Sequence, residues 1–533
     1  MTKSLRPLAG LAALLAVGLV AAPAFAQKSG GILKVHHQDS PASMSIIEEA
    51  TYSTVVPMME VFNNLVMYKQ DEPQNSMKSI VPDLATGWSW SEDGTELTFK
   101  LRQGVKWHDG KPFTANDVKC TYDLLLGKAK EKLRINPRKA WFRNLDEVTA
   151  DDEGEATFHL HRPQPAFITL LASGYSPIYP CHVSPREMRT QPIGTGPFKF
   201  VSFKANESIR VERDPDYWKP GRPYLDGIEY TIVPNRSTAI LAFVAGKLDM
   251  TWPYIITVPL LNDIQTQAPQ AICELKTTNA STNLLVNREV APFNNADLRR
   301  TMALALDRKA FIDILSDGKA KIGGAMLPPP EGLWGMTPEL LETLPGYGPD
   351  VQKNRAEARK IMEKLGYGPD KRLPLKVSAR NLNSYRDLPC GHRDRPAQRG
   401  LYRRRARHGR DRHWHAKVTR KDYSVAVNGT GSGVDDPDQQ FYENYVCGSD
   451  RNYSGYCNPE LDKEIDRQSM EPDQEKRKKL VWKMDRKLQE DGARPIITQN
   501  LMGTCWQPQV KGLTMMVNSI YNGWRFEDVW LDK

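Results

Sequence analysis

The chain has 533 residues, of which 40% are hydrophobic and 26% are charged, an ordinary composition for a soluble globular protein. This length exceeds one ordinary hydrophobic core, so two or three domains are expected. The formal net charge is +9, but residues 1–26 contribute two of these charges and residues 389–413 contribute seven, which excludes a basic surface spread over the whole molecule.

The first 26 residues have the three parts of a secretory signal peptide. Lys3 and Arg6 form a positive start, residues 8–22 are apolar, and small residues precede an expected cleavage between Ala26 and Gln27. A membrane anchor is the weaker alternative, because 15 apolar residues are short for a bilayer. No cysteine follows the cleavage site and no later segment has the length of a membrane span. The sequence therefore predicts a soluble periplasmic protein that is not itself membrane-spanning.

Further along the chain, four segments show clear periodicity. Residues 86–102 and 197–213 alternate apolar and polar side chains on both sides of a turn, which predicts two β-hairpins. Residues 296–315 and 475–490 carry apolar side chains at helical spacing, which predicts two helices, the first capped by Asn294 or Asn295. Proline and glycine cluster at 327–332 and 345–349, where loops are expected. Helical and strand-like segments alternate, so a mixed α/β or α+β class is favoured.

Seven cysteines in an exported chain leave one without a partner. Cys390 lies in an unusual basic segment, and the even set that remains is Cys120, Cys181, Cys273, Cys447, Cys457 and Cys505. Cys447 and Cys457 close a short loop rich in glycine and serine, so we expect a disulfide between them. For the other four, free buried thiols and disulfides both stay open. No C-x-x-C motif is present to support a zinc site.

No motif predicts catalysis. His108 and Asp109 are adjacent, and side chains of consecutive residues rarely form a catalytic pair. The run GTGSG at 429–433 lacks the lysine of a phosphate loop, so a pocket-lining or hinge loop is favoured. Histidines at 36–37 and 159–161 could bind a metal, but hydrogen-bonded strand histidines are the favoured interpretation. We expect no catalytic residue, no metal and no cofactor.

Six segments, in family order, resemble the periplasmic dipeptide- and oligopeptide-binding proteins of ABC importers, which form solute-binding protein family 5. They are VKWHDGKPFTANDVKCTYD (105–123), IGTGPFKF (193–200), RDPDYWKPGRPYLDGIEYTIV (213–233), AGKLDM (245–250), NLLVNREVAPFNNADLRRTMALALDR (283–308) and YCNPELDKEID (456–466). In the first of them, Thr114 or Asn116 is expected to cap a helix. The resemblance covers nearly the whole chain after residue 26.

This resemblance implies an α/β protein with a two-lobed periplasmic-binding-protein fold, class II-like, with an additional subdomain in the N-terminal lobe. Lobe I would comprise residues 27–63, 190–276 and 505–533, with the additional subdomain at 64–189, and lobe II would comprise residues 277–504. The implied function is the extracytoplasmic substrate-binding component of an ABC transporter. The lobes would close on a solute and deliver it to inner-membrane permease subunits. We expect a monomer without nucleic acid as a partner.

Ligand binding in such a protein needs aromatic walls and a few polar anchors. The candidates lie in loops near the lobe junctions, and each has a structural alternative. They are Trp252 in lobe I, Asn279, Ser281 and Asn283 at the inferred crossover, and Asn428, Gly431, Asp435 and Asp436 in the lobe II segment NGTGSGVDD.

One position departs from the pattern of the peptide-binding members. In those proteins an aspartate, three residues before an Asp-Pro-Asp sequence, pairs with the amino group of the peptide. Here Gly433 stands at that position, although Asp435 could take over the role with a shifted backbone. A short peptide remains the first expectation for the ligand, and an oligosaccharide, an opine-like compound or another small organic solute is the alternative. A secreted hydrolase and a nucleic-acid binder are the alternatives from other classes.

Residues 389–413 hold nine arginines and three histidines against two aspartates, unlike any other part of the chain. The segment has no apolar periodicity, and its like charges repel one another, so its own translation predicts neither a helix nor a strand. Synonymous codons for these residues permit a shifted reading that gives an amphipathic helix and then a strand, as the family would have here. Our hypothesis is a local frameshift, in the gene or in its sequencing, that is restored before Trp414.

Overall fold

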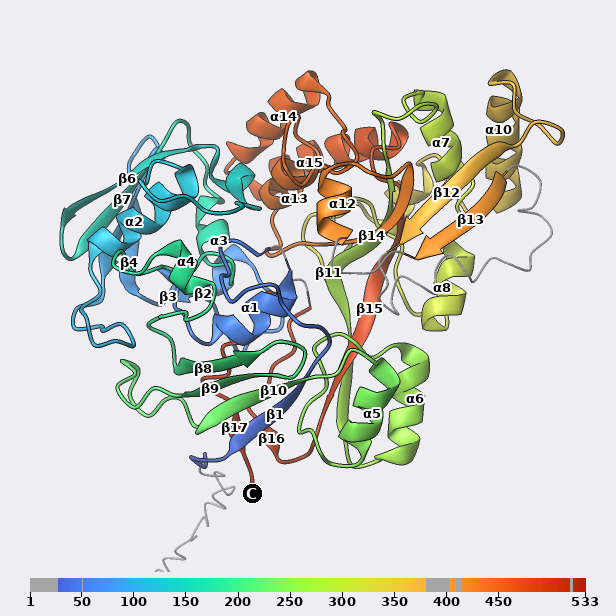
Figure 1. The fold of residues 1–533 in the computed structure, drawn as a ribbon. Helices are drawn as coiled ribbons and strands as arrows, with labels where there is room; N and C mark the ends of the chain where they lie inside the picture. The colour runs from blue at the N-terminus through green and yellow to red at the C-terminus, as the bar shows by residue number, and fades with distance from the viewer. Residues whose placement is uncertain (1–26, 50, 380–401, 409–413, 518–520) are drawn as a thin grey trace, which may run out of the picture.

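The computed structural model of the chain describes residues 27–49, 51–379, 402–408, 414–517 and 521–533 (Figure 1). The expected signal peptide, residues 1–26, lies outside the described residues, as does most of the basic segment 389–413. None of the helices in the described ranges combines the length and apolar character that a membrane crossing requires.

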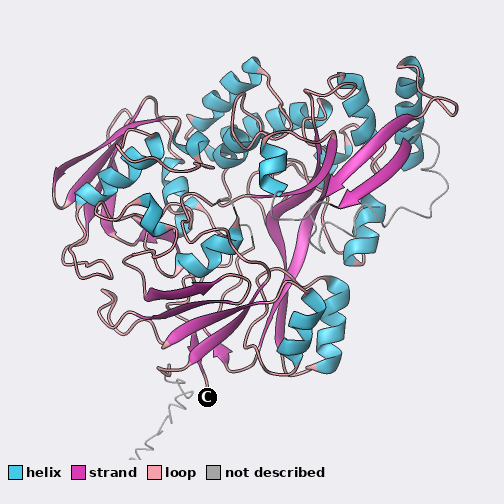
Figure 2. Ribbon diagram, in the orientation of Figure 1, coloured by secondary structure: helices cyan, strands magenta, loops and turns pink. Residues whose placement is uncertain are grey.

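Two lobes lie on either side of a pair of long strands, β11 (Ile272–Val286) and β15 (Ile496–Trp506). Helices lie around the sheet of lobe II, and the two long strands run through the centre of the molecule (Figure 2). The antiparallel register of β11 with β15 shifts between Thr277 and Ser281. On one side of this shift the strands lie beside α5 (Arg236–Val244) and α6 (Val258–Gln267), and on the other side they join the sheet of lobe II.

The main sheet of lobe I has the order β1-β10-β9-β8. Its strands are β1 (Ile32–His37), β10 (Gly227–Ile232), β9 (Ser208–Arg213) and β8 (Phe198–Lys204). β8 and β9 pair antiparallel, which confirms the hairpin expected at 197–213. Ile209 and Val211 alternate with exposed neighbours and are both buried, because successive side chains of a strand point to opposite faces. Lobe I also holds α1 (Tyr52–Met59) and the short strands β16 (Val510–Lys511) and β17 (Trp530–Leu531).

A second antiparallel sheet, with the order β4-β5-β7-β6, packs against α2 (Ala115–Leu126) beside lobe I. Its strands are β4 (Ala85–Trp90), β5 (Glu96–Leu101), β7 (Glu155–Leu160) and β6 (Leu145–Asp152). The pairing of β4 with β5 confirms the hairpin expected at 86–102. Thr114 caps α2, and its backbone N–H donates to the Asp117 carboxylate at 3.0 Å. The same region contains β2 (Val66–Tyr68), β3 (Ile80–Pro82), α3 (Phe167–Leu171), α4 (Pro185–Met188) and the 3₁₀ helices Met77–Ser79 and Lys139–Phe142.

The sheet of lobe II has the order β13-β12-β14-β11-β15. β12 (Leu373–Ala379) lies between β13 (Tyr402–His408) and β14 (Val425–Gly431), parallel to both. The helix expected at 475–490 is present as α15 (Gln474–Glu490). The other helices of this lobe are α7 (Ala296–Leu304), α8 (Arg308–Ser316), α9 (Pro338–Glu342), α10 (Val351–Lys364), α12 (Trp414–Thr419), α13 (Pro437–Asn444) and α14 (Pro459–Ser469).

Two sequence predictions were wrong in detail. The helix expected over 296–315 is two helices, because Asp307 begins a new one by accepting a hydrogen bond from the backbone of Ala310 at 3.0 Å. The basic segment, for which neither helix nor strand was expected, contains β13 at the edge of the lobe II sheet. Strand pairing uses backbone groups, which every residue except proline supplies, so a strand can form without apolar periodicity.

Three disulfides join cysteines of the described chain. Cys447 bonds to Cys457, the pair expected from the sequence, and Cys120 bonds to Cys181 between α2 and the segment that precedes α4. Cys273 bonds to Cys505, which lies directly opposite it on β15. This last bond fastens the two long strands at their lobe I end.

Candidate functional site

The two lobes contact each other through hydrogen bonds between buried side chains. Trp141, beside lobe I, donates from its indole Nε1 to the carboxylate of Glu443 on α13 of lobe II at 2.8 Å. Asn522, in the C-terminal segment, donates to the backbone carbonyl of Gly433 at 2.9 Å. The structure therefore has its lobes closed, and the side chains buried between them form the candidate site.

Lobe I contributes a row of aromatic side chains to this interface. Trp252 stacks on Tyr52 with ring centroids 5.6 Å apart, and Tyr52 meets Tyr521 edge to face at 6.1 Å. Tyr521 in turn lies 5.0 Å from Tyr175. Trp252 is fully buried, and its indole N–H has no hydrogen-bond partner among the described residues. A wall of this kind buries an apolar ligand body and leaves a buried donor available to it.

Lobe II contributes a compact group of amide and hydroxyl side chains from two paired strands. Asn283 and Ser281 on β11 lie opposite Asn428 and Thr430 on β14. Asn283 Nδ2 donates to the Thr430 hydroxyl at 2.9 Å, and Asn428 Nδ2 donates to the same hydroxyl at 3.2 Å. The side-chain oxygen of Asn283 is buried and accepts no hydrogen bond among the described residues. The structure thus brings three of the predicted residues together and leaves one acceptor for a ligand donor.

Glycine allows the lobe II loop to approach lobe I closely. A Cβ on Gly431 would lie 2.4 Å from the hydroxyl of Tyr521, and a Cβ on Gly433 would lie 3.1 Å from the hydroxyl of Ser173 and 3.4 Å from the Trp141 ring. A side chain at either position would meet lobe I before the present closure is reached. A side chain at Gly433 would therefore lie against Ser173, Trp141 and, within lobe II, Gln439.

An ionic corner, consisting of Arg138, Glu443 and Arg451, lies at the end of the interface nearest Trp141. Arg451 pairs with Glu443 at 3.4 Å, and the guanidinium of Arg138 lies over the Tyr175 ring at 3.3 Å. Burial lowers the pKa of the Arg138 guanidinium below its usual range. Burial acts to lower the pKa of Arg451, but the Glu443 carboxylate and three neighbouring tyrosines together outweigh it, so the pKa is raised. Two arginines against one glutamate leave this corner with an excess of positive charge.

Three of the predicted binding residues hold lobe II together in this structure. Asn279 donates from Nδ2 to the carbonyl of Val434 at 3.1 Å, and the Asp435 carboxylate accepts from the backbone of Leu333 at 3.2 Å. Asp436 begins α13 and accepts two hydrogen bonds from Arg477, each at 2.8 Å. Burial raises the pKa of Asp436 to about 6, although the arginine opposes this. The bond to Leu333 thus joins Asp435 to its own lobe.

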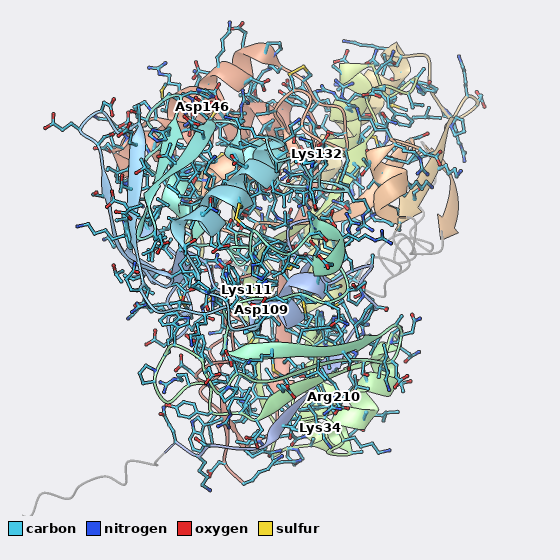
Figure 3. All side chains as sticks on the ribbon, turned by 60° about the vertical axis from the view of Figure 1, so that its left-hand side comes forward. Lys34, Asp109, Lys111, Lys132, Asp146 and Arg210 are labelled. Carbon is cyan, nitrogen blue, oxygen red and sulfur yellow. A yellow bond between two sulfur atoms is a disulfide. The ribbon has the colours of Figure 1, made fainter. Side chains whose placement is uncertain are left out.

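The histidines singled out in the sequence have structural partners. His108 accepts from the backbone of Gly194 at 3.3 Å through Nδ1, and its Nε2 lies 2.9 Å from the carbonyl of Gly196. Burial lowers the pKa of His108 to about 4, so it is a neutral ring that joins two loops. Its neighbour Asp109 lies beside Lys111 at 3.5 Å (Figure 3) and binds His182 at 2.7 Å instead. The two side chains therefore do not form a catalytic pair.

The other histidine groups are strand residues with similar roles. His36 Nε2 lies 2.9 Å from the carbonyl of Val233, and burial lowers its pKa to about 4. His159 lies between the Thr149 hydroxyl, at 3.0 Å, and the Glu96 carboxylate, at 3.2 Å. Among the described residues no group of three histidine, cysteine, aspartate or glutamate side chains could hold a metal ion.

Sequence reasoning missed the residues of the ionic corner and most of the aromatic wall. Arg138 and Trp141 belong to a mixed basic and aromatic stretch, and Glu443 and Arg451 flank a short turn in lobe II. Nothing in their local sequence separates them from ordinary surface charges. Only the closed arrangement of the lobes brings them together, across 302 residues in the case of Trp141 and Glu443.

Two lobes joined by two crossing strands, with a closed aromatic and polar interface, define a two-lobed solute-binding protein. Residues 79–388 match the family described as "Bacterial extracellular solute-binding proteins, family 5 Middle". The chain belongs to this family, and its function is the binding of a solute outside the cytoplasm.

Relatives and solved structures support the same class. A probable D,D-dipeptide-binding periplasmic protein of Escherichia coli is 26% identical over 524 residues, covering 92% of this chain and 95% of the relative. Heme-binding protein A of Haemophilus influenzae is 28% identical over 346 residues, or 60% of this chain and 59% of that protein. A periplasmic binding protein of Helicobacter pylori, in complex with the peptide STSA, superimposes with a TM-score of 0.83 at 20% identity, covering 95% of this chain and 99% of the other.

Proposed function

We propose that this protein is the periplasmic receptor of an ABC importer, which encloses a short peptide between its lobes and delivers it to the membrane permease. The observation that carries the proposal is the closed interface, in which an aromatic wall from lobe I faces amides and hydroxyls from lobe II. Lobe closure buries the ligand and creates the shape that the permease reads, so the proposed role is binding and transfer without a chemical step.

The lobe boundaries are part of the same proposal. The register shift of β11 between Thr277 and Ser281 supports a crossover close to residue 277. On the return strand, Leu501 and Gln499 face the two ends of this shift, which supports a crossover a few residues before the expected boundary at 504–505. Bending at these two points would open and close the site.

A ligand other than a peptide is the second candidate, and the absence of an aspartate at Gly433 favours it. An oligosaccharide or an opine-like solute needs no carboxylate to hold a terminal ammonium group. The sugar or opine would use the same aromatic wall and the amides of Asn283 and Asn428.

Thermal-shift screening of the mature protein tests both candidates, because a ligand that binds the native state raises the melting temperature by mass action. The screen should compare di- to pentapeptides, oligosaccharides and opines, each at several concentrations. A shift of several degrees with peptides alone is the expected result. Stabilisation by a sugar or an opine, with no response to any peptide, would replace the first candidate by the second.

A further inference from the structure

The guanidinium of Arg138 is buried without a carboxylate partner among the described residues. Its side chain is 1% exposed, and Nη1 donates to the backbone carbonyls of Ile46 at 3.3 Å and Glu49 at 2.8 Å. Nε and Nη2 have no hydrogen-bond partner in the described part of the chain. The nearby Glu443 carboxylate contacts Arg451 and Trp141 through Oε1, and its Oε2 forms no hydrogen bond with Arg138 or with any other described residue.

A buried charge with unsatisfied donors is strongly unfavourable unless a partner of opposite charge completes it. The two unsatisfied nitrogens share one edge of the planar guanidinium, a geometry that matches the two oxygens of a carboxylate. The same chain shows this match at another site: Arg189 binds Glu48 through Nε at 2.6 Å and Nη2 at 2.9 Å. Arg138 thus presents the edge that Arg189 uses, but without the carboxylate.

The surroundings favour an anion that comes from the ligand. The Tyr175 ring at 3.3 Å covers one face of the Arg138 guanidinium and fixes its plane. Arg451 adds a second positive charge, and its Nε also has no partner among the described residues. The corner lies at the interface of the two lobes, where Trp141 and Glu443 meet, so a ligand enclosed by closure would contact it.

We propose that Arg138 binds a carboxylate of the ligand through Nε and Nη2, so that the substrates of this protein are carboxylate-bearing solutes. For a short peptide this carboxylate is the C-terminal one. The inference rests on the proposed site between the lobes. Gly433 cannot bind the amino group of a peptide, and Arg138 would bind the carboxylate at the other end instead.

The test compares each probe with a neutral analogue of the same size. Unblocked alanine peptides of two to four residues and their C-terminal amides are titrated into the mature protein by calorimetry, together with glucuronate and glucose as a pair without peptide bonds. A charge-assisted pair of hydrogen bonds predicts that the acid of the bound pair binds about ten- to a hundredfold more tightly than its neutral partner. In Arg138→Met this ratio falls to about one.

Arg162→Met is the matched control. This arginine also crosses to lobe II, where it binds Asp466 at 2.8 Å and the Tyr442 hydroxyl at 2.6 Å, but it is not part of the ionic corner. Its loss weakens closure, so acid and neutral probes lose affinity by the same factor and their ratio stays as in the wild type. If Arg138→Met does not fold, the wild-type protein still tests the carboxylate preference, because an acid-to-neutral affinity ratio of about one would overturn it.

The outcomes separate this inference from the proposed function. If peptide acids and their amides bind equally well, the proposed carboxylate site is wrong, but the protein is still a peptide receptor. Glucuronate that binds in an Arg138-dependent manner, with no peptide binding, supports the carboxylate site and removes the peptide role. A co-purified ligand without a carboxylate, identified by mass spectrometry of the denatured protein, overturns the inference, as does the failure of every acid probe.

Discussion

Gly431→Ala tests whether lobe closure depends on the absence of a side chain at this position. The added Cβ would lie 2.4 Å from the Tyr521 hydroxyl and 3.0 and 3.1 Å from two ring carbons of the same tyrosine. Gly431 has no positive φ, so alanine fits its backbone and the strain falls on the contact between lobes. To restore ordinary van der Waals separation, the lobes must stop short of full closure by roughly 1 Å, which is a typical overpacking distortion.

Overpacking of this kind costs about 1–3 kcal/mol. Because the contact exists only in the closed form, the whole cost opposes closure, and ligand affinity should fall by about five- to a hundred-and-fifty-fold. Calorimetric titration with a ligand found in the thermal-shift screen measures this loss. The melting temperature without ligand should change little, since the open form has no such contact.

Two variants make the measurement specific. Tyr521→Phe in the Gly431→Ala background removes the atom at 2.4 Å and leaves contacts of 3.0 Å or more, so part of the affinity should return. Gly87→Ala on β4 is the matched control, because a Cβ there meets nothing within 4 Å. Unchanged affinity in Gly431→Ala, or a lowered melting temperature without ligand, would refute the argument from closure.

Three further predictions concern stability and the gene. Arg477→Met leaves the buried carboxylates of Asp436 and Asp438 without their cation. The free energy of unfolding in urea should therefore fall by about 3–5 kcal/mol. A loss smaller than about 1 kcal/mol would mean that the carboxylates are solvated. Burial raises the pKa of Asp485 from 3.8 to about 6, so the native state favours its protonated form and stability is lost as the pH rises from about 4 through 6. Asp485→Asn should remove about 3 kcal/mol of that fall, and an unchanged pH profile would show that Asp485 does not titrate there. Resequencing of the gene over residues 389–413 should reveal the proposed frameshift, and an uninterrupted reading of the arginines disproves it.

Sequence periodicity predicted strands and helices correctly where they depend on residues close together in the chain. The alternation at 197–213 needs only a hairpin turn and one buried face, and β8 and β9 have that arrangement. The boundary inside 296–315 was missed because its apolar spacing continues through Asp307, whose capping bond becomes visible only with the backbone in place. The strand β13 was missed because its pairing with β12 depends on a neighbouring strand and on backbone groups common to all residues.

Only part of the candidate site could be predicted from the sequence. Ser281 and Asn283 were expected near the crossover, and they meet Asn428 on an adjacent strand of lobe II. Asn428 was expected in a loop, but it lies on β14. Asp436 was a candidate because it is an acid in a polar loop, but its buried bond to Arg477 gives it a structural role in this fold. A single sequence does not distinguish an acid that binds a ligand from one that binds an arginine far along the chain.

The sequence by itself determined the family, the mixed α/β class, the hairpins and the pairing of Cys447 with Cys457, because motifs, periodicity and short loops depend on residues close together in the chain. The tertiary structure decided which side chains face each other between the lobes. Arg138 and Glu443 are 305 residues apart in the sequence, and they belong to one charged corner only because two separate lobes close on each other. A buried guanidinium with unsatisfied donors requires an anion, whereas an exposed one is solvated by water. Whether Arg138 is buried depends on the closed fold and cannot be seen in the sequence.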